Sequence, residues 1–380
     1  MSSLAGLLVA DFSRVLAGPY ATMLLGDLGA EVVKVERPGG GDDVRSWGPP
    51  YADGEATYFL GVNRNKRSIA LDLLDPVDNE VARRLAARAD VLVENFRPGA
   101  MDRFGLGYEQ LRSVNPGLVY CSITGFGAGP GAAMPGYDLL AQAVGGLMSV
   151  TGEPDGSGTK TGVALVDVIT GLHAALGMLA ALRHKDRTGA GQRVSVSLLS
   201  SLLSALTNHA SAYVAAGVVP RAMGNQHPSI APYEVFEAAD RPLVIAVGND
   251  RQFAALCRVL GRPDLAADPR YATNAGRVAA RTPLVRSLSE ALSVRTADAW
   301  FAALTAAGVP CGPINDLAAA FDLADSLGLA PVAEVADPRR DQPVRQVANP
   351  IGLDLTPPEY RLAPPRLGQD GERIREMLDP

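Results

Sequence analysis

The sequence has few of the residues that would indicate a disulfide-rich or metal-binding protein. Its 380 residues include three cysteines, Cys121, Cys257 and Cys311, which are widely spaced and form no CxxC pair. This odd number and spacing exclude a disulfide framework and a structural zinc site. The four histidines form neither an HExxH motif nor another paired spacing, so we predict no metal site.

Further absences exclude other protein classes. The N-terminus has no basic head followed by an apolar run and a cleavage site, and no GxSxG motif offers a hydrolase nucleophile. The most apolar segment, residues 168–182, is shorter than a bilayer-spanning helix. A net charge of −6 gives no broad attraction to nucleic acid or to an anionic membrane. We therefore predict a cytoplasmic protein with neither nucleic acid nor membrane as a partner.

The sequence does contain alternating strand and helix patterns typical of an α/β protein. Apolar residues make up 47% of the chain and charged residues 20%, which is an ordinary globular composition. Short apolar runs predict strands, and helical periodicity predicts the segments between them. The predicted strands are residues 7–12, 31–36, 90–94 and 118–123, and the predicted helices are residues 19–28 and 78–87. Such alternation indicates a parallel, doubly wound sheet that binds ligands beyond the carboxyl ends of its strands.

The rest of the chain divides near residue 219. Before it, the pattern predicts a helix from Asp167 to about His184, a strand over 192–198 and a further helix to about 216. After it, a strand at 243–247 and helices at 251–260, 285–292 and 297–307 indicate a smaller α+β unit. The tail from Ala336 is rich in proline and charge.

Two glycine-rich segments are candidates for phosphate-binding loops. Residues 125–131 follow a predicted strand, but their spacing matches neither GxGxxG nor the P-loop, and Pro130 interrupts them. A turn is the favoured interpretation. Residues 39–41 also form a predicted turn, and the neighbouring Lys34, Arg37 and Arg45 could contact a phosphate, although the residues alone favour a solvated charged loop.

Asp167 begins a long apolar stretch and allows two interpretations. Aspartate is favoured as a helix N-cap because it accepts hydrogen bonds from first-turn N–H groups, and the local sequence favours this role. A carboxylate in a pocket is also a nucleophile. The roles are compatible, because a helix dipole that lowers the pKa would keep the acid anionic. His173 is interpreted as a packing residue, and His227 lies in a predicted loop that could line a site.

Seven segments in one order resemble the family III CoA-transferases (the CaiB/BaiF family). This group includes formyl-CoA transferase and carnitine CoA-transferase, with α-methylacyl-CoA racemase as a branch. The resemblance covers nearly the whole chain and is specific for the superfamily but much less so for the substrate. The segments are residues 11–19, 28–36, 63–68, 94–99, 136–138, 224–228 and 364–368.

The resemblance implies a fold and an assembly. It predicts a Rossmann-like large domain formed by residues 1–218 and a C-terminal return over 333–380, with a small α+β domain over 219–332 between them. It also implies that two subunits thread through each other as an interlocked homodimer.

The resemblance further implies an activity and its residues. Asp167 falls at the family's nucleophile, which forms an aspartyl anhydride and then an aspartyl-CoA thioester. CoA is a substrate here, and no permanently bound cofactor is implied. Segment 224–232 is a candidate lid. Arginines among the CoA-contacting positions suit phosphate. Those positions are Leu16, Ala17, Arg37, Leu71, Asp72, Leu73, Asn95, Phe96, Arg97, Arg103, Tyr137 and Asp138.

At two places this sequence differs from particular branches of the family, and these differences reduce the number of activities that we expect. Where the racemases carry a histidine and an asparagine, this chain has Tyr137 and Val163, which disfavours α-proton abstraction. Where the oxalate-acting branch carries a glutamine, this chain has Leu16, and a four-glycine run near 227–230 is absent. We predict transfer of CoA from an acyl-CoA, with succinyl-CoA as one candidate, to an organic acid. The alternatives are a racemase or isomerase, and a non-catalytic CoA-binding protein in which Asp167 only caps a helix.

Overall fold

The computed structural model describes residues 2–379 and divides the chain into two compact units. The first comprises residues up to Leu147, Lys160–Val219 and the chain from Ala330 onward, and the second comprises Met148–Thr159 and Pro220–Leu329. The sequence-based boundaries of 1–218, 219–332 and 333–380 did not anticipate that residues 148–159 group with the second unit. Helix α7 (Leu147–Val150) lies where the chain enters this short segment.

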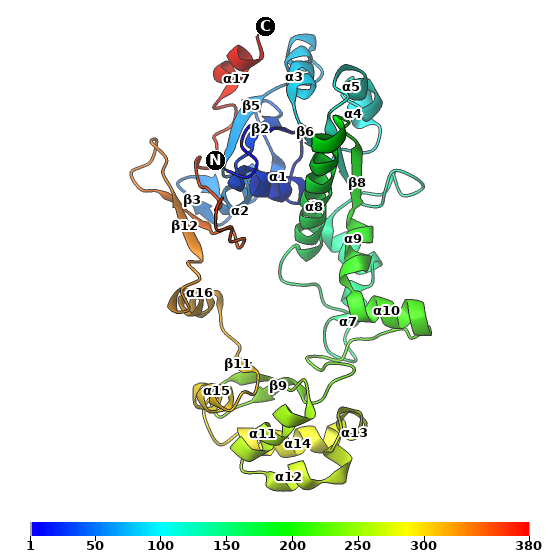
Figure 1. Ribbon diagram of the computed structural model, residues 1–380, viewed down its shortest axis with the longest axis vertical. Coiled ribbons are helices and arrows are strands. Elements are labelled where there is room, and N and C mark those ends of the chain that lie inside the picture. The colour runs from blue at the N-terminus through cyan, green and yellow to red at the C-terminus, as the bar shows by residue number, and fades with distance from the viewer. Residues whose placement is uncertain (1, 380) are drawn as a thin grey trace. The chain divides into compact units, whose positions relative to one another are not determined.

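A six-stranded sheet forms the centre of the first unit (Figure 1). Its order is β5-β2-β1-β6-β7-β8, and every neighbouring pair is parallel. The predicted doubly wound sheet is thereby confirmed. The strands are β1 (Leu8–Asp11), β2 (Glu31–Glu36), β5 (Lys66–Ala70), β6 (Val91–Glu94), β7 (Val119–Thr124) and β8 (Arg193–Ser197).

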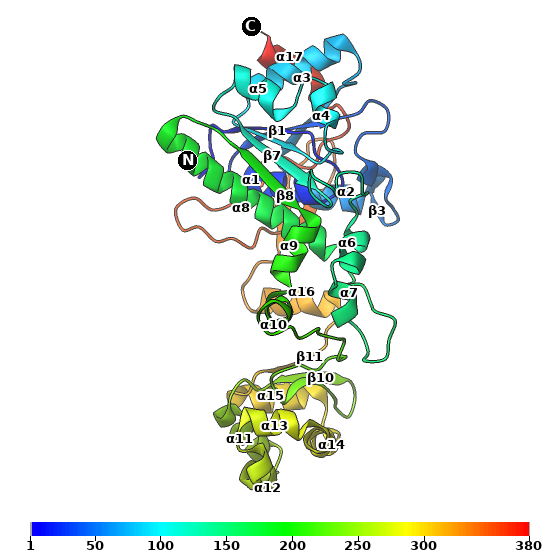
Figure 2. The same cartoon turned by 90° about the vertical axis from the view of Figure 1, so that its right-hand side faces the viewer.

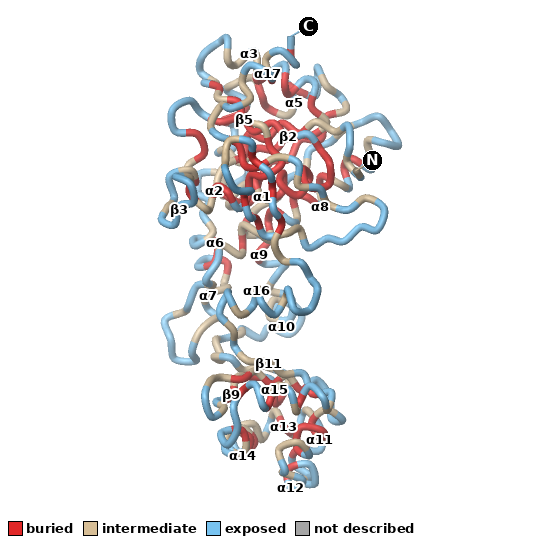
Figure 3. Tube along the Cα trace, turned by 90° about the vertical axis from the view of Figure 1, so that its left-hand side faces the viewer, coloured by how far each residue is buried: buried red, intermediate tan, exposed pale blue. Residues whose placement is uncertain are grey.

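Helices cover both faces of this sheet because successive strand residues point to opposite sides. Val9 packs with α1 and α8 on one face, whereas Ala10 packs with α3 and α5 on the other. The buried residues accordingly concentrate along the sheet and α1 (red in Figure 3). The helices of this unit are α1 (Ala17–Asp27), α2 (Thr57–Val62), α3 (Pro76–Arg88), α4 (Ala100–Arg103), α5 (Tyr108–Val114), α6 (Asp138–Val144), α8 (Leu165–Thr188), α9 (Leu198–Ala205), α10 (Thr207–Ala216) and α17 (Gly371–Leu378).

Helix α8 lies directly against the start of α1 (Figure 2). A glycine permits this approach, since a Cβ atom at Gly171 would lie 2.6 Å from the carbonyl oxygen of Ala17. Helix α8 has 24 residues, and an 18-residue stretch of it has a mean hydropathy of 1.8, so it is long and apolar enough to cross a membrane and the predicted shortness of this segment was wrong. Ala174 and Met178 nevertheless join the core against the sheet, as in a helix that covers a globular core.

The C-terminal segment returns to the first unit and is tied to the motif at residues 63–68. Asn65 accepts backbone N–H bonds from Arg361 and Leu362, and its own N–H donates to Leu362. Arg64 forms a two-pronged buried ion pair with Asp27 at 2.9 and 2.6 Å. The short elements of this region are the 3₁₀ helix η1 (Asp43–Ser46) and the strand pairs β3 (Tyr51–Ala52) with β4 (Glu55–Ala56) and β12 (Val332–Val335) with β13 (Val344–Val347).

The second unit has its own antiparallel sheet, ordered β11-β10-β9, and its own core. This matches the α+β character predicted for the residues beyond 219. Its strands are β9 (Tyr233–Glu237), β10 (Pro242–Ala246) and β11 (Cys311–Pro313). Its helices are α11 (Asp250–Val259), α12 (Pro263–Ala267), η2 (Pro269–Tyr271), α13 (Asn274–Ala279), α14 (Arg281–Leu292), α15 (Ala297–Ala306) and α16 (Leu317–Ser326).

The predicted lid, residues 224–232, is fastened within this second unit. Arg281 donates to the carbonyl oxygens of His227 and Ile230 at 2.6 and 3.1 Å. Asn274 bonds to the backbone on either side of Ile230, and Arg277 donates to Ala231 at 2.8 Å. These bonds hold the segment within the second unit, and any motion of the segment relative to that unit would require them to break.

Candidate active site

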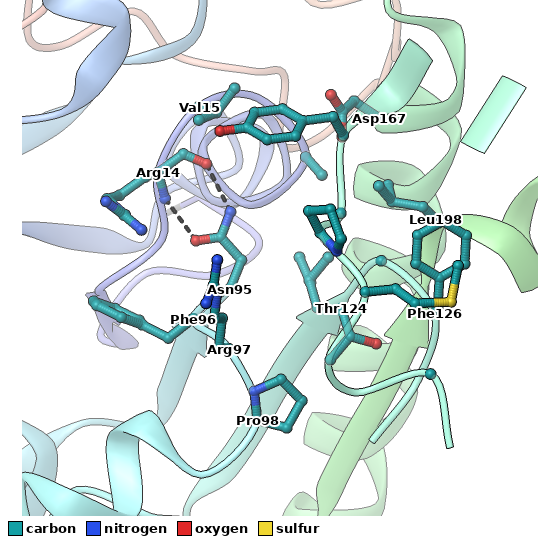
Figure 4. A pocket seen from close by; sticks show the side chains of 18 of the residues that line it. Arg14, Val15, Asn95, Phe96, Arg97, Pro98, Thr124, Phe126, Asp167 and Leu198 are labelled. Atoms are coloured by element: carbon teal, nitrogen blue, oxygen red, sulfur yellow. Dashed lines mark hydrogen bonds between the residues drawn. The ribbon is translucent and has the colours of Figure 1, made fainter. Parts of the chain in front are cut away.

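A cavity lies where the direction of chain winding changes in the large sheet. The chain leaves β1 toward β2 on one side and β6 toward β7 on the other, and parallel sheets bind ligands at such a point. The cavity has a volume of about 270 Å³ and is lined by residues 14–17 after β1 and 95–98 after β6 (Figure 4). Asp167, near the start of α8, also lines it.

The loop after β1 is held in an unusual backbone conformation. Val15 has a φ of 69°, in the left-handed region that a β-branched residue rarely adopts. Asn95 fixes the preceding residue, because its amide oxygen accepts the Arg14 N–H at 2.9 Å and its amide nitrogen donates to the Arg14 carbonyl at 2.7 Å (Figure 4). Asp42 accepts the Val15 N–H at 3.1 Å. The loop is therefore a rigid wall of the cavity.

A cluster of buried charged side chains holds this loop in place. Lys34 pairs with Asp42 at 2.8 Å and donates to the Ser13 carbonyl at 3.0 Å, with both charged side chains inaccessible to solvent. Burial alone would raise the pKa of Asp11, but Lys66 and Lys34 outweigh it and lower that pKa to about 2. Burial conversely lowers the pKa of Lys66 to about 8 against the opposing effect of Asp11. Lys34 and Asp42 thus hold the loop through Ser13 and Val15, and Asp11 and Lys66 belong to the same buried cluster.

The glycine-rich segment 125–131 also lines the cavity, which the sequence did not reveal. It is a turn, as predicted, and the Gly127 N–H donates to the Thr124 hydroxyl at 3.1 Å. Gly125 is needed for packing, since a Cβ there would lie 2.5 Å from the Cα atom of Gly136. The segment shapes the cavity through close backbone contact.

Asp167 does not cap α8, so that prediction was wrong. The helix begins at Leu165, and Asp167 is its third residue. The cap comes from Asp138, the first residue of α6, whose Oδ1 accepts the N–H groups of Val166 and Asp167 at 2.8 and 3.1 Å. The local pattern could not show this, because the two aspartates are 29 residues apart.

The pKa of Asp167 is raised to about 7, first by burial and then by the negative charge of Asp138. We expected the helix dipole to lower this pKa, and the opposite holds because burial, together with the negative charge of Asp138, disfavours the Asp167 anion. Near neutral pH the carboxyl group therefore exchanges between an acid and an unusually basic carboxylate. Perturbed carboxyl groups in a cavity are typical of reactive sites.

The sequence matches the model of CoA-transferase family III over residues 4–371. The chain belongs to this family. It is 44% identical to the succinate–glutarate CoA-transferase of Agrobacterium fabrum, covering 99% of this chain and 96% of the relative. It is 43% identical to the mouse succinyl-CoA:glutarate CoA-transferase, with 100% and 87% covered. It is 41% identical to the acetyl-CoA:oxalate CoA-transferase of Acetobacter aceti, with 98% and 94% covered.

A solved structure agrees with this family assignment. A CaiB/BaiF family protein from Brucella suis superposes with a TM-score of 0.88 at 42% identity, and the match covers 100% of both chains. The resemblance recognised from the seven sequence segments is thus confirmed, as is the assignment to the transferases of this family.

The positions implied by the family resemblance gather in three neighbouring hollows of the first unit. The cavity of Asp167 also contains Leu16, Ala17, Asn95, Phe96, Arg97 and Tyr137. A second, more apolar pocket of about 210 Å³ contains Arg37, Leu71, Asp72, Leu73 and again Phe96. Arg103 lines a shallow hollow that shares Leu73 with this second pocket. Asp138 lines none of them and instead holds the first turn of α8.

Arg14 is a site residue that sequence reasoning missed. It lines both the Asp167 cavity and the second pocket, and its guanidinium lies 5.2 Å from the ring centre of Phe96. Its buried Nε has no hydrogen-bond partner among residues 2–379. Asp43 contacts both Arg14, at 3.4 Å, and Arg37, at 2.6 Å. A basic residue in the first loop after β1 was the signal that could have identified it.

His173 and His227 both contact neighbouring side chains. His173 lies within hydrogen-bonding distance, 3.1 Å, of the Ser201 hydroxyl, and the His227 ring lies 5.2 Å from that of Tyr233. Within residues 2–379, no group of three or more His, Cys, Asp or Glu side chains is arranged to hold a metal ion.

Proposed function

We propose that this protein moves CoA from an acyl-CoA donor to a small carboxylic acid, with Asp167 as the nucleophile. The observation that carries the proposal is the position of Asp167, a half-buried carboxyl group of raised pKa inside a cavity at the switch point of the sheet. An adjoining pocket, joined to the cavity by Arg14 and Phe96, offers apolar surface and cationic groups for a nucleotide-bearing thiol ester.

The first half of the reaction forms a covalent CoA ester of the enzyme. The ionised Asp167 attacks the thioester carbonyl of the donor, the carbon–sulfur bond breaks, and a mixed anhydride and CoA thiolate result. The thiolate then attacks the Asp167 carbonyl carbon, so that the donor acid leaves as a carboxylate with one oxygen from Asp167. Asp167 now carries CoA as a thioester.

The second half runs the same steps toward the acceptor. The acceptor carboxylate attacks the aspartyl thioester and releases CoA thiolate, which gives a second anhydride. The thiolate attacks the acceptor carbonyl, forms the new acyl-CoA and restores the Asp167 carboxylate. The two half-reactions balance without a redox partner or a metal. Because anhydrides hydrolyse, the cavity must exclude water while CoA is bound.

We place CoA along the two pockets, with its thiol end at Asp167 and its phosphates near Arg14, Arg37 and Arg97. Guanidinium groups bind phosphate oxygens through paired charge-assisted hydrogen bonds. Glutarate and other dicarboxylic acids are the first acceptors to test, and succinyl-CoA the first donor, because the mouse and Agrobacterium relatives at 43% and 44% identity are named succinyl-CoA:glutarate and succinate–glutarate CoA-transferases.

We further propose that the protein is cytoplasmic and forms the interlocked homodimer implied by the family. The first unit exposes apolar side chains on α8, α9 and α10 that a monomer would leave in water. They include Leu172, Leu176, Leu203 and Val214, which are exposed by 46%, 66%, 49% and 82%. Light scattering coupled to gel filtration tests this: a monomeric mass at micromolar concentration would contradict the dimer.

Trapping of the covalent intermediate tests the proposed reaction. The protein is incubated with succinyl-CoA, treated with hydroxylamine or borohydride, and digested for mass spectrometry. We expect modification at Asp167 in the wild type and none in Asp167→Asn. Asp186→Asn, an exposed position on the same helix, is the matched control and should be modified as the wild type is.

The same preparation separates the alternative functions. A racemase would incorporate solvent deuterium at the α-carbon of an acyl-CoA without any acceptor acid. A non-catalytic CoA-binding protein would bind CoA but show neither exchange nor modification. CoA exchange across a panel of donors and dicarboxylates, with Asp167 modified, supports the transferase. No exchange across that panel with Asp167 unmodified refutes it.

A further inference from the structure

The first turn of α8 is organised by a chain of hydrogen bonds that begins outside the helix. Asp138 Oδ1 accepts the N–H groups of Val166 and Asp167, as described above. Its other oxygen, Oδ2, accepts a hydrogen bond of 2.5 Å from the side-chain amide of Gln142, one turn later on α6. The Gln142 amide oxygen in turn accepts the Thr161 backbone N–H at 2.9 Å.

These bonds tie three parts of the chain together around Asp167. Gln142 is buried, with 1% of its surface exposed, so its two polar groups depend on these partners. Thr161 lies in the segment that leads into α8, and its hydroxyl donates to the Val163 carbonyl at 2.9 Å. This chain of hydrogen bonds from the helix N–H groups through Asp138 and Gln142 to Thr161, called the relay below, therefore fixes both the segment that leads into the helix and the direction of its first turn.

The relay also determines what surrounds the Asp167 carboxyl group. In an ordinary N-terminal turn, the free N–H groups would stabilise a nearby carboxylate. Here the Asp138 carboxylate takes up two of them, and its negative charge remains close to Asp167.

We propose that Asp138 and Gln142 are positioning residues, which hold the first turn of α8 so that Asp167 presents its carboxylate to the cavity while the helix N–H groups remain engaged elsewhere. This inference rests on the proposed transferase function. It also gives Asp138 a role different from the CoA contact implied by the family resemblance, because neither oxygen of Asp138 is left without a protein donor.

Other ionisable groups near Asp167 must be considered before pH effects are assigned to Asp138. Tyr58, on α2, is coupled to both aspartates, and burial followed by those two charges raises its pKa to about 12. Tyr137 precedes α6 and lines the cavity, and Tyr20, on α1, lies against Gly171 of α8. His173 is directed to Ser201 of α9. Among these groups, Asp138 is the one whose charge acts on the ionisation of Asp167.

Two variants separate the charge from the hydrogen-bond relay. Asp138→Asn keeps an acceptor for the helix N–H groups but removes the negative charge, and its amide nitrogen, facing the Gln142 amide nitrogen, also loses the bond between these two side chains. The effect of the charge is therefore read by comparing Asp138→Asn with Gln142→Leu, which loses the same bond. Gln142→Leu keeps that charge but breaks the link to Thr161. Asp186→Asn, on the exposed side of α8, is the control. For each protein, circular dichroism and the melting temperature report folding, calorimetry gives the CoA dissociation constant, and kcat and KM are measured from pH 5.5 to 9.

For Asp138→Asn we expect the acid limb of kcat/KM to move about one pH unit lower, with CoA affinity unchanged within about twofold. For Gln142→Leu we expect kcat to fall about 10- to 100-fold with KM nearly unchanged and the acid limb in place, since small displacements of a reacting group have effects of this size. Asp186→Asn should match the wild type.

Other outcomes overturn the inference in distinguishable ways. An unmoved acid limb in Asp138→Asn together with a tenfold weaker CoA affinity would make Asp138 a ligand contact. Wild-type kcat in Gln142→Leu would show that the relay does not position Asp167, and this test stands even if Asp138→Asn does not fold. If the wild type itself shows no CoA exchange, the proposed function fails rather than the role of the relay.

Discussion

Replacement of Asp167 by asparagine should make the protein more stable, and the gain should grow with pH. The pKa of this carboxyl group is about 7 in the folded protein, against an ordinary value of 3.8 for an aspartate in water. Below pH 3.8 both states are protonated, and the group then has no effect on stability. Between the two pKa values folding takes up a proton, so the folded state loses stability as pH rises, and the loss is complete above about pH 7.

The magnitude follows from the separation of the two pKa values. They lie about three pH units apart, which corresponds to about 4 kcal/mol at 1.36 kcal/mol per unit. Asp167 is only half-buried, so solvent screening reduces this figure. We expect Asp167→Asn to raise the free energy of unfolding by about 1–3 kcal/mol more at pH 8 than at pH 4.5.

Urea unfolding at a series of pH values measures this difference directly. The control is Asp186→Asn, which replaces an exposed aspartate on the same helix and should show no such pH dependence. A stability gain for Asp167→Asn that is the same at pH 4.5 and pH 8 would refute the reasoning. So would a loss that grows with pH, because it would mean that the protein stabilises the Asp167 anion after all.

Three further predictions concern activity and the framework of the first unit. Because only the ionised Asp167 attacks, kcat/KM should rise through about pH 7 and level off above it; a profile flat from pH 5.5 to 9 would contradict this. Arg64→Met leaves buried Asp27 without its cationic partner and should lower the free energy of unfolding by about 3–5 kcal/mol in urea titrations, whereas a loss below 1 kcal/mol would argue against the pair. Gly171→Ala should force α8 away from Ala17, cost about 1–3 kcal/mol and reduce kcat; unchanged kcat would show that this contact does not position Asp167.

The central strands could be predicted because short apolar runs in the local sequence indicate buried strands. Residues 31–36 match β2 at both ends, the predicted strand at 90–94 starts one residue before β6, and the one at 118–123 is displaced from β7 by one residue at each end. Strand β5 could not be predicted in this way, because it begins with Lys66 and Arg67. Lys66 is buried through Asp11, which lies 55 residues away in sequence, and no local pattern shows such a partner.

The site was only partly predictable for the same reason. The resemblance indicated Asp167, and the cavity contains it. Its local sequence suggested a cap with a lowered pKa, whereas the cap is Asp138, on a separate helix, and the pKa is raised. Capping by a distant residue is a tertiary contact, and here the charge of that residue adds to burial in raising the pKa of Asp167. Arg14 was overlooked because its role depends on the strand order that brings the loops after β1 and β6 together.

Isotope transfer into Asp167 tests the central claim most directly. The wild-type protein is turned over with succinyl-CoA and an acceptor acid whose carboxylate carries oxygen-18, then digested and analysed by mass spectrometry. When CoA thiolate attacks the acceptor carbonyl of the second anhydride, one acceptor oxygen stays on the aspartate. We therefore predict oxygen-18 in the peptide that contains Asp167 and none at Asp138 or Asp186. Transfer of CoA to the acceptor with no label at Asp167 would contradict the account.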